Sequence, residues 1–137
     1  MIDQKTIDVI FAALCCWREA RGEPFEVKVA QIWCQRNRVE AHWIHDNTYQ
    51  DVACHPHQFS GLTQPGDPNL VKFPESSDHS WQDCILVAEG VTVNNSYPDP
   101  TQHAVFYHDV SIKEAPAVWG PVTRSVQVGR LVFYRAV

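Results

Sequence analysis

The sequence predicts an α+β fold in which helices come first and a small antiparallel sheet follows in the C-terminal half. Before residue 90, apolar residues recur at helical spacing in three stretches. After residue 90, turn-forming residues separate short β-branched and aromatic runs that are typical of strands. Helices followed by strands along a chain indicate the α+β class. The length, 137 residues, corresponds to a single domain over residues 1–137.

Three long helices are predicted. The first covers residues 6–18, where apolar side chains follow the i, i+3, i+4, i+7 spacing of one buried face: Ile7, Ile10, Phe11, Leu14 and Trp17. Gly22 breaks this helix, and Pro24 suits the first position of a second one over residues 24–39. The second helix is apolar around most of its circumference, which predicts a central, buried position. The third covers residues 78–90 and ends at Gly90.

The remaining segments are predicted to be shorter elements and one long loop. Residues 49–53 are a candidate short helix. Residues 54–77 contain four prolines and two glycines, so we expect a long ordered loop, and such loops in compact domains are usually functional. Residues 104–108 and 131–134 are predicted strands, and residues 126–129 form either a third strand or the turn into the last one.

Composition excludes several classes of partner. The net charge is -5 and the 11 Lys and Arg residues are not clustered, so no nucleic-acid partner is expected. No apolar run is long enough for a membrane helix, so we expect no membrane insertion, and we expect a monomer. The N-terminus does not resemble a secretory signal, which predicts synthesis in the cytoplasm.

The five cysteines are expected to be reduced, because their number is odd and Cys16, Cys34 and Cys84 lie in apolar-periodic stretches. The run Cys54-His55-Pro56-His57 suggests a metal site, but adjacent ligands around a proline fit no common zinc spacing. We therefore expect no metal and no cofactor.

Glu19 is the sharpest candidate for chemistry. It directly follows the apolar helix and lies near Trp17, where partial burial would raise its pKa. A carboxylic acid that stays protonated near neutral pH can protonate a glycosidic oxygen. By itself this context still favours an ordinary exposed carboxylate, because most acidic residues lie on the surface. Glu23 is interpreted as capping the second helix, since Gly22 and Pro24 prevent it from sharing a helical face with Glu19.

Several spaced motifs cover nearly the whole chain in order: Glu19-Ala20-Arg21-Gly22-Glu23-Pro24, Val29-Ala30, Asn37-Arg38-Val39, Gln58-Phe59-Ser60, Ala88 to Gly90, Asp99-Pro100-Thr101, Ala104, Phe106-Tyr107, Trp119, Gly129 and Phe133-Tyr134-Arg135. Together they resemble the SleB/CwlJ-type cell wall hydrolase family.

The resemblance implies a lysozyme-like fold that cleaves peptidoglycan glycan strands between N-acetylmuramic acid and N-acetylglucosamine. It assigns Glu19 as the catalytic acid and places Arg21 and Glu23 nearby in structural roles. A lytic transglycosylase needs only this one carboxyl group. A hydrolytic muramidase would need a second acid about 5 to 9 Å away, and no spacing singles out one of the candidates, Asp67, Asp99 and Asp109.

The resemblance also suggests substrate-binding residues. Gln58, Phe59 and Ser60 match the family's cleft motif, in which an amide and a hydroxyl suit sugar acetamide and hydroxyl groups. Tyr107 and Trp119 are candidates for sugar stacking, with structural packing an equal alternative. Two departures stand out: the family commonly has Gly where this chain has His103, and it often continues the cleft motif with Cys or Trp where this chain has Gly61-Leu62. His103 is either a hydrogen-bond partner near the substrate or an ordinary exposed histidine.

Two other classes of function remain open from the sequence. A thiol amidase of the peptide stem would use Cys15, Cys16 or Cys54 with a histidine base. A non-catalytic module would only bind the wall. In the favoured interpretation the protein is a phage endolysin, made in the host cytosol and released to the wall through a membrane lesion, in a holin-dependent manner.

Overall fold

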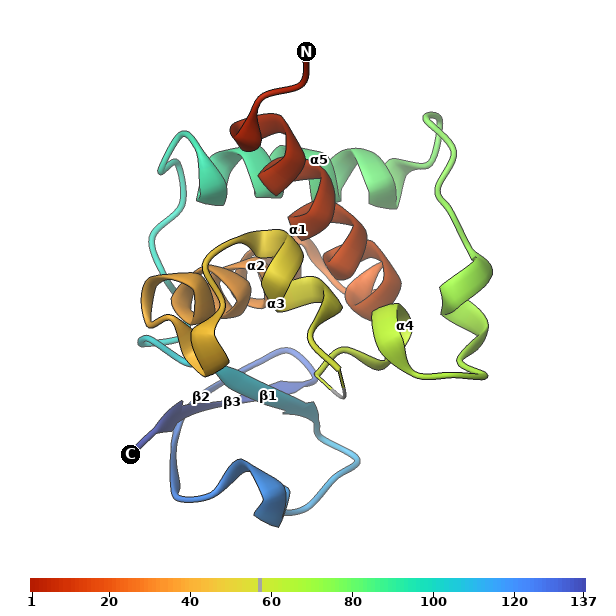
Figure 1. Ribbon diagram of the computed structural model, residues 1–137. Helices are drawn as coiled ribbons and strands as arrows, with labels where there is room; N and C mark the ends of the chain where they lie inside the picture. Colours follow the sequence, from red (N-terminus) through yellow and green to blue (C-terminus); the bar gives the residue numbers. More distant parts are fainter. Residues whose placement is uncertain (57) are drawn as a thin grey trace.

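The computed structural model describes residues 1–56 and 58–137, and it confirms the predicted α+β fold (Figure 1). Four α-helices of six residues or more form one part of the molecule: α1 (Gln4–Ala20), α2 (Phe25–Glu40), α3 (Tyr49–Cys54) and α5 (His79–Thr92). A sheet of β1 (Phe106–Asp109), β2 (Val122–Val128) and β3 (Leu131–Ala136) forms the other. Short helical turns connect them: η1 (Trp43–His45), α4 (Ser60–Thr63), η2 (Pro68–Val71) and η3 (Ala117–Trp119).

Helix α1 begins at a side-chain cap and runs past its predicted end. The Asp3 carboxylate accepts a hydrogen bond from the Thr6 backbone N–H at 2.9 Å, which satisfies one free donor of the first turn. The predicted apolar stripe is only partly buried, because Ile10 is 42% exposed. The buried face is instead built from small residues such as Ala12, Ala13 and Cys16. Small side chains let α1 approach α2 and α5 closely, and its last turn carries Glu19.

Helix α2 is central, as predicted, with Ile32 packed toward α1 and α5 and Val27 packed toward the sheet. The predicted capping role of Glu23 is wrong. Pro24 occupies the cap position, and no side chain caps the helix. A capping glutamate must lie at the third helical position, whereas Glu23 precedes the helix and donates its backbone N–H to the Ala20 carbonyl in the connecting turn.

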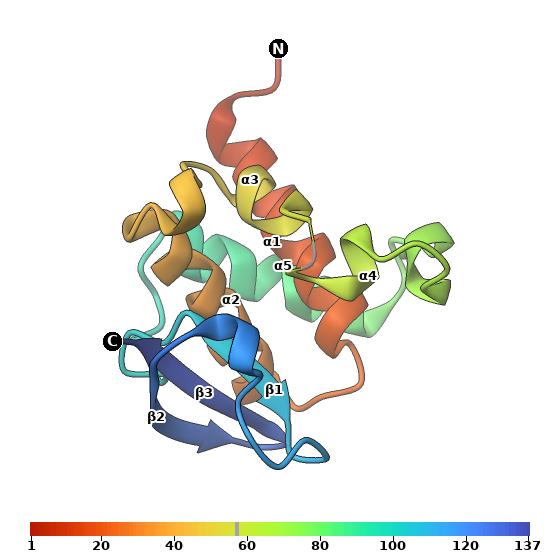
Figure 2. The ribbon, with the colours of Figure 1, turned by 60° about the horizontal axis from the view of Figure 1, so that its bottom comes forward.

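The sheet is antiparallel with strand order β1-β3-β2, and Figure 2 shows it below the end of α2. Phe106 pairs with Tyr134 in β3, and Val128 pairs with Leu131 across the turn from β2 to β3. Strand β2 begins at Val122, four residues before the predicted start, because its exposed polar residues hide the apolar alternation expected of a strand. Helix α2 covers one face of the sheet. The turns η1 and η3 cover the opposite face with aromatic side chains.

The predicted long loop over residues 54–77 contains two short helices, α4 and η2. Each has only four residues, too few to show helical periodicity in a sequence. The loop is tied to α1 by two arginines. Arg18 donates to the Lys72 carbonyl at 3.1 and 3.2 Å, and Arg21 donates to the Asn69 side chain at 2.9 Å.

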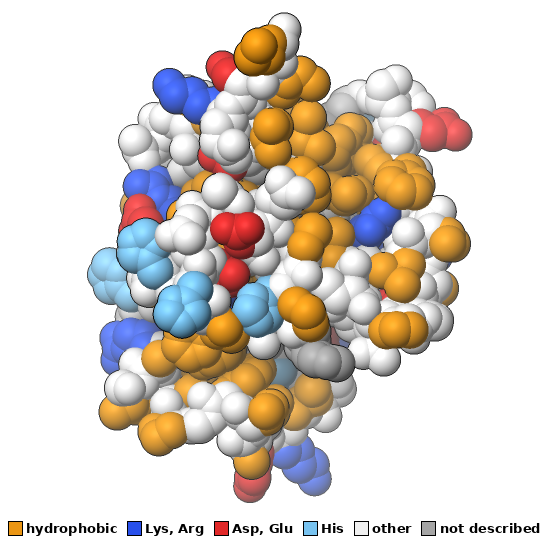
Figure 3. Space-filling view, in the orientation of Figure 1, with side chains coloured by type: hydrophobic (Ala, Val, Ile, Leu, Met, Phe, Trp, Pro, Cys, Tyr) orange, Lys and Arg blue, Asp and Glu red, His pale blue; other side chains and the backbone are white. Residues whose placement is uncertain are grey.

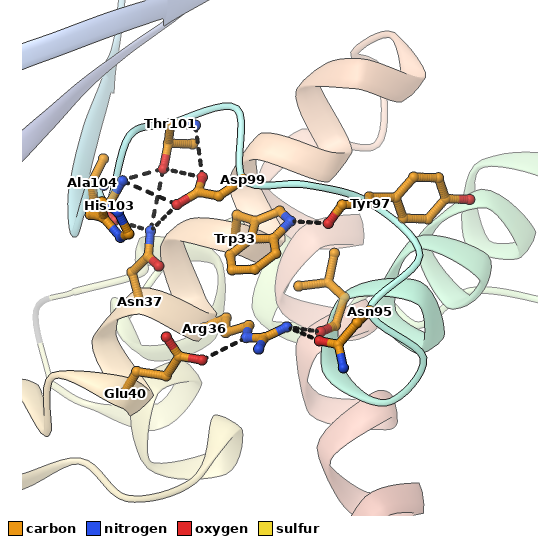
Figure 4. Close-up of polar contacts among 11 residues, drawn as sticks. Trp33, Arg36, Asn37, Glu40, Asn95, Tyr97, Asp99, Thr101, His103 and Ala104 are labelled. Atoms are coloured by element: carbon orange, nitrogen blue, oxygen red, sulfur yellow. Dashed lines mark hydrogen bonds and ion pairs between the residues drawn. The ribbon is translucent and has the colours of Figure 1, made fainter.

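A buried polar network sets the entry into β1 (Figure 4). The Asn37 amide of α2 donates to the Asp99 carboxylate at 3.1 Å and to the Ala104 carbonyl at 3.0 Å. Asp99 also accepts from the backbone and the hydroxyl of Thr101, both at 2.7 Å. These bonds fix the turn over residues 99–104 against α2, and β1 therefore starts in a defined position.

Gly90 lies inside α5 instead of ending it, which corrects the sequence prediction. A Cβ atom at this position would lie 2.3 Å from the ring of Tyr97, which packs edge-on against Phe25. The glycine is therefore required by the close approach of an aromatic ring, and the helix continues to Thr92.

All five cysteines are unpaired thiols, and Cys54 alone is exposed. Among the described residues, no helix combines the length and apolar character that crossing a bilayer requires.

Substitution Gly90→Ala should destabilise the domain by about 1 to 3 kcal/mol, because the added methyl group overpacks the contact with Tyr97. Urea unfolding followed by circular dichroism measures this loss. Gly22→Ala is the matched control, since nothing lies within 4 Å of its Cβ position. Equal stability of the two variants would contradict the packing explanation.

Candidate active site

A cleft of about 220 Å³ opens where the end of α1, the middle of the chain and the sheet meet. It is lined by residues from α1, α2, the segment before α4, α4 and its C-terminal cap, β1 and η3: Glu19, Arg38, Gln58, Phe59, Ser60, Gln64, Tyr107 and Trp119. Six of these eight were candidates from the sequence. Among the described residues that line the cleft, Glu19 is the single carboxylic acid.

The surroundings of Glu19 favour its protonated form. Burial raises the pKa of Glu19 to about 7 from an ordinary 4.5, and the negative charge of Asp67 adds to this effect. The Gly61 backbone N–H and the Arg38 guanidinium lower the pKa in part. Its position in the last turn of α1 acts in the same direction as burial, because the carbonyl end of a helix carries partial negative charge.

Gly61 allows α4 to approach the Glu19 carboxyl group closely. A Cβ atom at this position would lie 3.2 Å from Arg18 Cβ and 3.3 Å from Glu19 Oε2. Both contacts are tighter than ordinary van der Waals distances, so a larger residue would displace Glu19 or α4. The departure from the family pattern at this position therefore bears directly on the geometry around Glu19.

Arg38 is a buried cation in the wall of the cleft. It is 3% exposed, its Nε donates to the Val105 carbonyl at 2.6 Å, and one terminal nitrogen donates to Gln58 Oε1 at 3.2 Å. Its guanidinium stacks over the Phe59 ring, with 4.7 Å between the guanidinium carbon and the ring centroid. No carboxylate in the described part of the chain forms an ion pair with Arg38. Its charge is therefore left to act on Glu19 and on whatever occupies the cleft.

Phe59 and Tyr107 form the floor of the cleft. Phe59 is 2% exposed and packs at 6.3 Å from the Tyr107 ring, so it is a core residue that also reaches the cleft. The Tyr107 hydroxyl accepts a hydrogen bond from Gln31 at 3.4 Å, and Gln35 donates to Gln31 at 2.8 Å. Burial raises the pKa of Tyr107 well above its usual value, and the neighbouring Glu19 charge raises it further. The phenol is therefore neutral and keeps its proton, so it can donate a hydrogen bond to a substrate oxygen.

Gln58, Ser60 and Trp119 also line the cleft, as the sequence led us to expect. Their roles in binding substrate stay predictions. Trp119 stacks on Phe106 at 4.7 Å with an angle of 10°, so it packs in the structure as well as lining the cleft.

The other three candidates lie outside the cleft lining. His103 is exposed, and its backbone N–H donates to Asp99 at 3.1 Å. Its φ of 68° lies in the left-handed region that favours glycine, which explains the family's usual residue at this position. Arg21 bridges α1 and η2 and stacks over Trp17 at 4.6 Å, a structural role near the site. Glu23 is half-buried in the turn between α1 and α2.

None of the three candidate second carboxylates lines the cleft. The Asp67 carboxylate accepts from the Asn69 backbone N–H at 2.8 Å and caps η2. Asp99 is held in the network with Asn37 and Thr101. Asp109 pairs with Arg130 at 3.0 Å on the sheet. Asp67 is the one whose charge affects the pKa of Glu19.

The run Cys54-His55-Pro56-His57 suggested a metal site in the sequence. Among the described residues, no group of three or more His, Cys, Asp and Glu side chains could hold a metal ion. His55 pairs with Asp46 at 3.2 Å, and His57 lies outside the described residues.

Two lining residues, Arg38 and Gln64, were not assigned to the site from the sequence. Arg38 belongs to the Asn37-Arg38-Val39 motif of the family resemblance, and this motif was the signal that could have identified it, since α2 carries several other charged residues. Gln64 follows α4 in a segment without sequence periodicity, so nothing in the sequence distinguishes it.

Comparisons with known proteins give one family and two similar structures. The model of the family described as Cell Wall Hydrolase matches residues 22–134. The crystal structure of the catalytic domain of the Bacillus cereus SleB protein superposes with a TM-score of 0.67 and 23% identity, covering 97% of this chain and 91% of that one. The catalytic domain of the germination-specific lytic transglycosylase SleB from Bacillus anthracis superposes with a TM-score of 0.68 and 23% identity, covering 96% of this chain and 95% of that one. No curated protein sequence matches the chain significantly.

The raised pKa of Glu19 predicts a pH-dependent cost in stability. The folded state holds this proton more tightly than the unfolded state, so stability is lost as pH rises from about 4.5 to about 7 and stays reduced above that. Glu19→Gln removes the cost, and it should stabilise the domain by up to about 3 kcal/mol at pH 8 and by nearly nothing at pH 4. Urea unfolding at the two pH values measures the difference.

The matched control is Glu114→Gln, a substitution of an exposed glutamate away from the cleft, which should change stability little at either pH. An equal effect of Glu19→Gln at pH 4 and pH 8 would contradict the burial of a protonated carboxyl group.

Proposed function

The chain belongs to the cell wall hydrolase family, and we propose that it cleaves peptidoglycan glycan strands between N-acetylmuramic acid and N-acetylglucosamine by lytic transglycosylation. In this proposal Glu19 is both the general acid and the general base. The product carries a 1,6-anhydromuramyl end, and no water is consumed.

The observation that carries the proposal is a single desolvated carboxylic acid in a cleft whose other described lining residues are neutral or cationic. With a pKa of about 7, Glu19 is substantially protonated near neutral pH. It can donate its proton to the glycosidic oxygen while the bond from that oxygen to C1 of the muramyl residue breaks. The carboxylate then accepts the proton of the muramyl 6-hydroxyl as that oxygen bonds to C1, which restores the acid.

Arg38 supports the second half of this cycle. Its buried guanidinium lowers the pKa of Glu19 and so stabilises the carboxylate that forms when the proton leaves. Burial favours the acid before the reaction, and the cation limits the cost of the carboxylate after it. A general acid/base works best when its pKa lies near the working pH, and these opposing influences bring Glu19 there.

The similar solved structures support the same chemistry by analogy. The Bacillus anthracis domain is described as a germination-specific lytic transglycosylase. Its fold matches this chain over nearly the full length of both, and the cell wall hydrolase model matches residues 22–134, which include every residue that lines the cleft except Glu19.

A hydrolytic muramidase is the second candidate, and the electrostatic effect of Asp67 on Glu19 favours Asp67 as its second acid. Such a role would require the Asp67 side chain to leave the cap of η2, where it accepts the Asn69 N–H. A transglycosylase requires no such movement, and this difference favours the single-acid mechanism.

A thiol amidase has less support. Cys15 and Cys16 are fully buried, and burial raises their pKa well above the usual value, so neither thiolate forms readily. Cys54 is exposed but does not line the cleft, and burial also raises its pKa. A non-catalytic wall-binding module would gain nothing from a glutamic acid held at a pKa of about 7.

We propose further that the protein serves host-cell lysis by a phage, being made in the cytosol and reaching the wall through a membrane lesion. Five unpaired cysteines suit synthesis in a reducing compartment. Finding the protein in purified phage particles before lysis would contradict this soluble-endolysin role.

Glu19→Gln should lower the rate of glycan release from purified sacculi by about 100- to 10,000-fold, the usual contribution of general acid/base catalysis. Mass spectrometry of the fragments made by the wild type should show anhydro ends, one water lighter than the reducing ends of a hydrolase. Reducing-end products from the wild type would contradict transglycosylation, and full activity of Glu19→Gln would contradict its catalytic role.

Asp67→Asn distinguishes the two mechanisms. If Asp67 acts only through its charge, this variant keeps its rate at pH 6 within about threefold. The decline in activity at higher pH then moves to lower pH, because the pKa of Glu19 falls when the negative charge is removed. A loss of 100-fold or more at every pH would instead make Asp67 a second catalytic acid.

A further inference from the structure

A second hollow lies beside the catalytic cleft and continues it past Trp119. The two spaces share Gln58 and Trp119 as wall residues. The hollow has a volume of about 150 Å³, and its remaining wall consists of Trp43, Ile44, Phe106 and Val118. It is therefore a predominantly apolar extension of a cleft whose main part is lined by polar and aromatic residues.

The hollow lies between η1 and η3, on the face of the sheet opposite α2. Trp43 packs edge-on against Phe106 with ring centroids 4.9 Å apart, and Phe106 stacks on Trp119. This aromatic ladder gives the hollow a rigid base. Figure 3 shows hydrophobic side chains gathered on this face at the sheet end of the molecule.

Two apolar side chains at the rim are left in solvent. Val118 is 90% exposed and Ile44 is 46% exposed, although both line the hollow. Exposed apolar side chains at a concave site gain most when a ligand covers them, since burial of apolar surface contributes about 25 cal/mol per Å².

The backbone of η1 is held in an unfavourable conformation at this place. His42, Ile44 and His45 have φ values of 50°, 50° and 65°. A β-branched residue such as Ile44 rarely adopts the left-handed region, and such residues cost about 1 to 3 kcal/mol each. This conformation presents Trp43 and Ile44 together at the hollow, and strain of this kind is concentrated at functional sites.

We propose that this hollow is a sugar subsite that binds the N-acetyl group of a glycan residue next to those in the catalytic cleft. The acetamido methyl packs against Ile44 and Val118. A space of about 150 Å³ holds about five water molecules, enough for this group of four heavy atoms. The inference rests on the proposed function, because it takes a glycan strand as the ligand.

The subsite makes cleavage depend on the length of the strand. Val118→Asp places a charge at the apolar rim, and because Val118 is 90% exposed, the substitution removes little packing. On stem-free glycan strands long enough to fill the hollow, it should raise KM about tenfold and leave kcat within twofold. On the shortest strands that are cleaved, it should change neither value.

Val71→Asp is the matched control. Val71 is 81% exposed, it lies in η2, and it lines neither space, yet the substitution adds the same charge. It should behave as the wild type on strands of every length. Equal KM values for Val118→Asp and Val71→Asp on long strands would overturn the subsite.

The acetamido contact is tested separately with Val118→Asp on chemically de-N-acetylated strands of the same length. These strands have no acetyl methyl to pack at the rim, so the substitution should not raise KM on them. A rise of about tenfold in KM on both kinds of strand would overturn the N-acetyl assignment.

Failure of the proposed function looks different in the same experiment. Wild-type protein would then release no fragments from strands of any length, and the subsite would fall with it. Wild-type cleavage that Val118→Asp does not alter leaves the proposed function in place and removes only the subsite.

Discussion

Desolvation of the Glu19 carboxyl group is the constraint around which this cleft is arranged. Burial at the end of α1 raises the pKa of Glu19 to about 7, and the charge of Asp67 acts in the same direction. Arg38 opposes both from the wall of the cleft, where its own charge is stabilised by stacking on Phe59 and by hydrogen bonds to Val105 and Gln58. One carboxyl group is thereby able to donate a proton and to take it back, which a single-acid mechanism requires.

The rest of the fold maintains this balance by fixing two segments relative to α1. Arg18 and Arg21 hold the segment that contains α4 and η2, and the absence of a side chain at Gly61 lets α4 come close to Glu19 Oε2. The Asn37 network on the other side of α2 fixes the start of β1 and hence Tyr107. A change in either segment that let more water reach Glu19 would lower the pKa of Glu19 toward the ordinary value.

Helical periodicity and β-branched runs predicted the long helices and two of the three strands, because those elements bury one face and repeat regularly. The short helices α4 and η2 were missed, since their positions depend on arginines far away in the sequence. Gly90 was misassigned because its partner, Tyr97, belongs to the following loop. For the site, local context suggested Glu19 but left it no better than a surface residue. Arg38 stayed hidden because its role depends on burial beneath the loop over residues 58–64, which no local pattern reveals.

The pKa of Glu19 can be measured directly by carbon-13 NMR titration of its side-chain carboxyl, assigned by comparison with the Glu19→Gln variant. A midpoint near 7 is expected if burial at the end of α1 controls this group. A midpoint near 4.5 would mean that the carboxyl is solvated and ionised at neutral pH. Glu19 could not then serve as the acid that protonates the glycosidic oxygen, and the single-acid mechanism would be wrong.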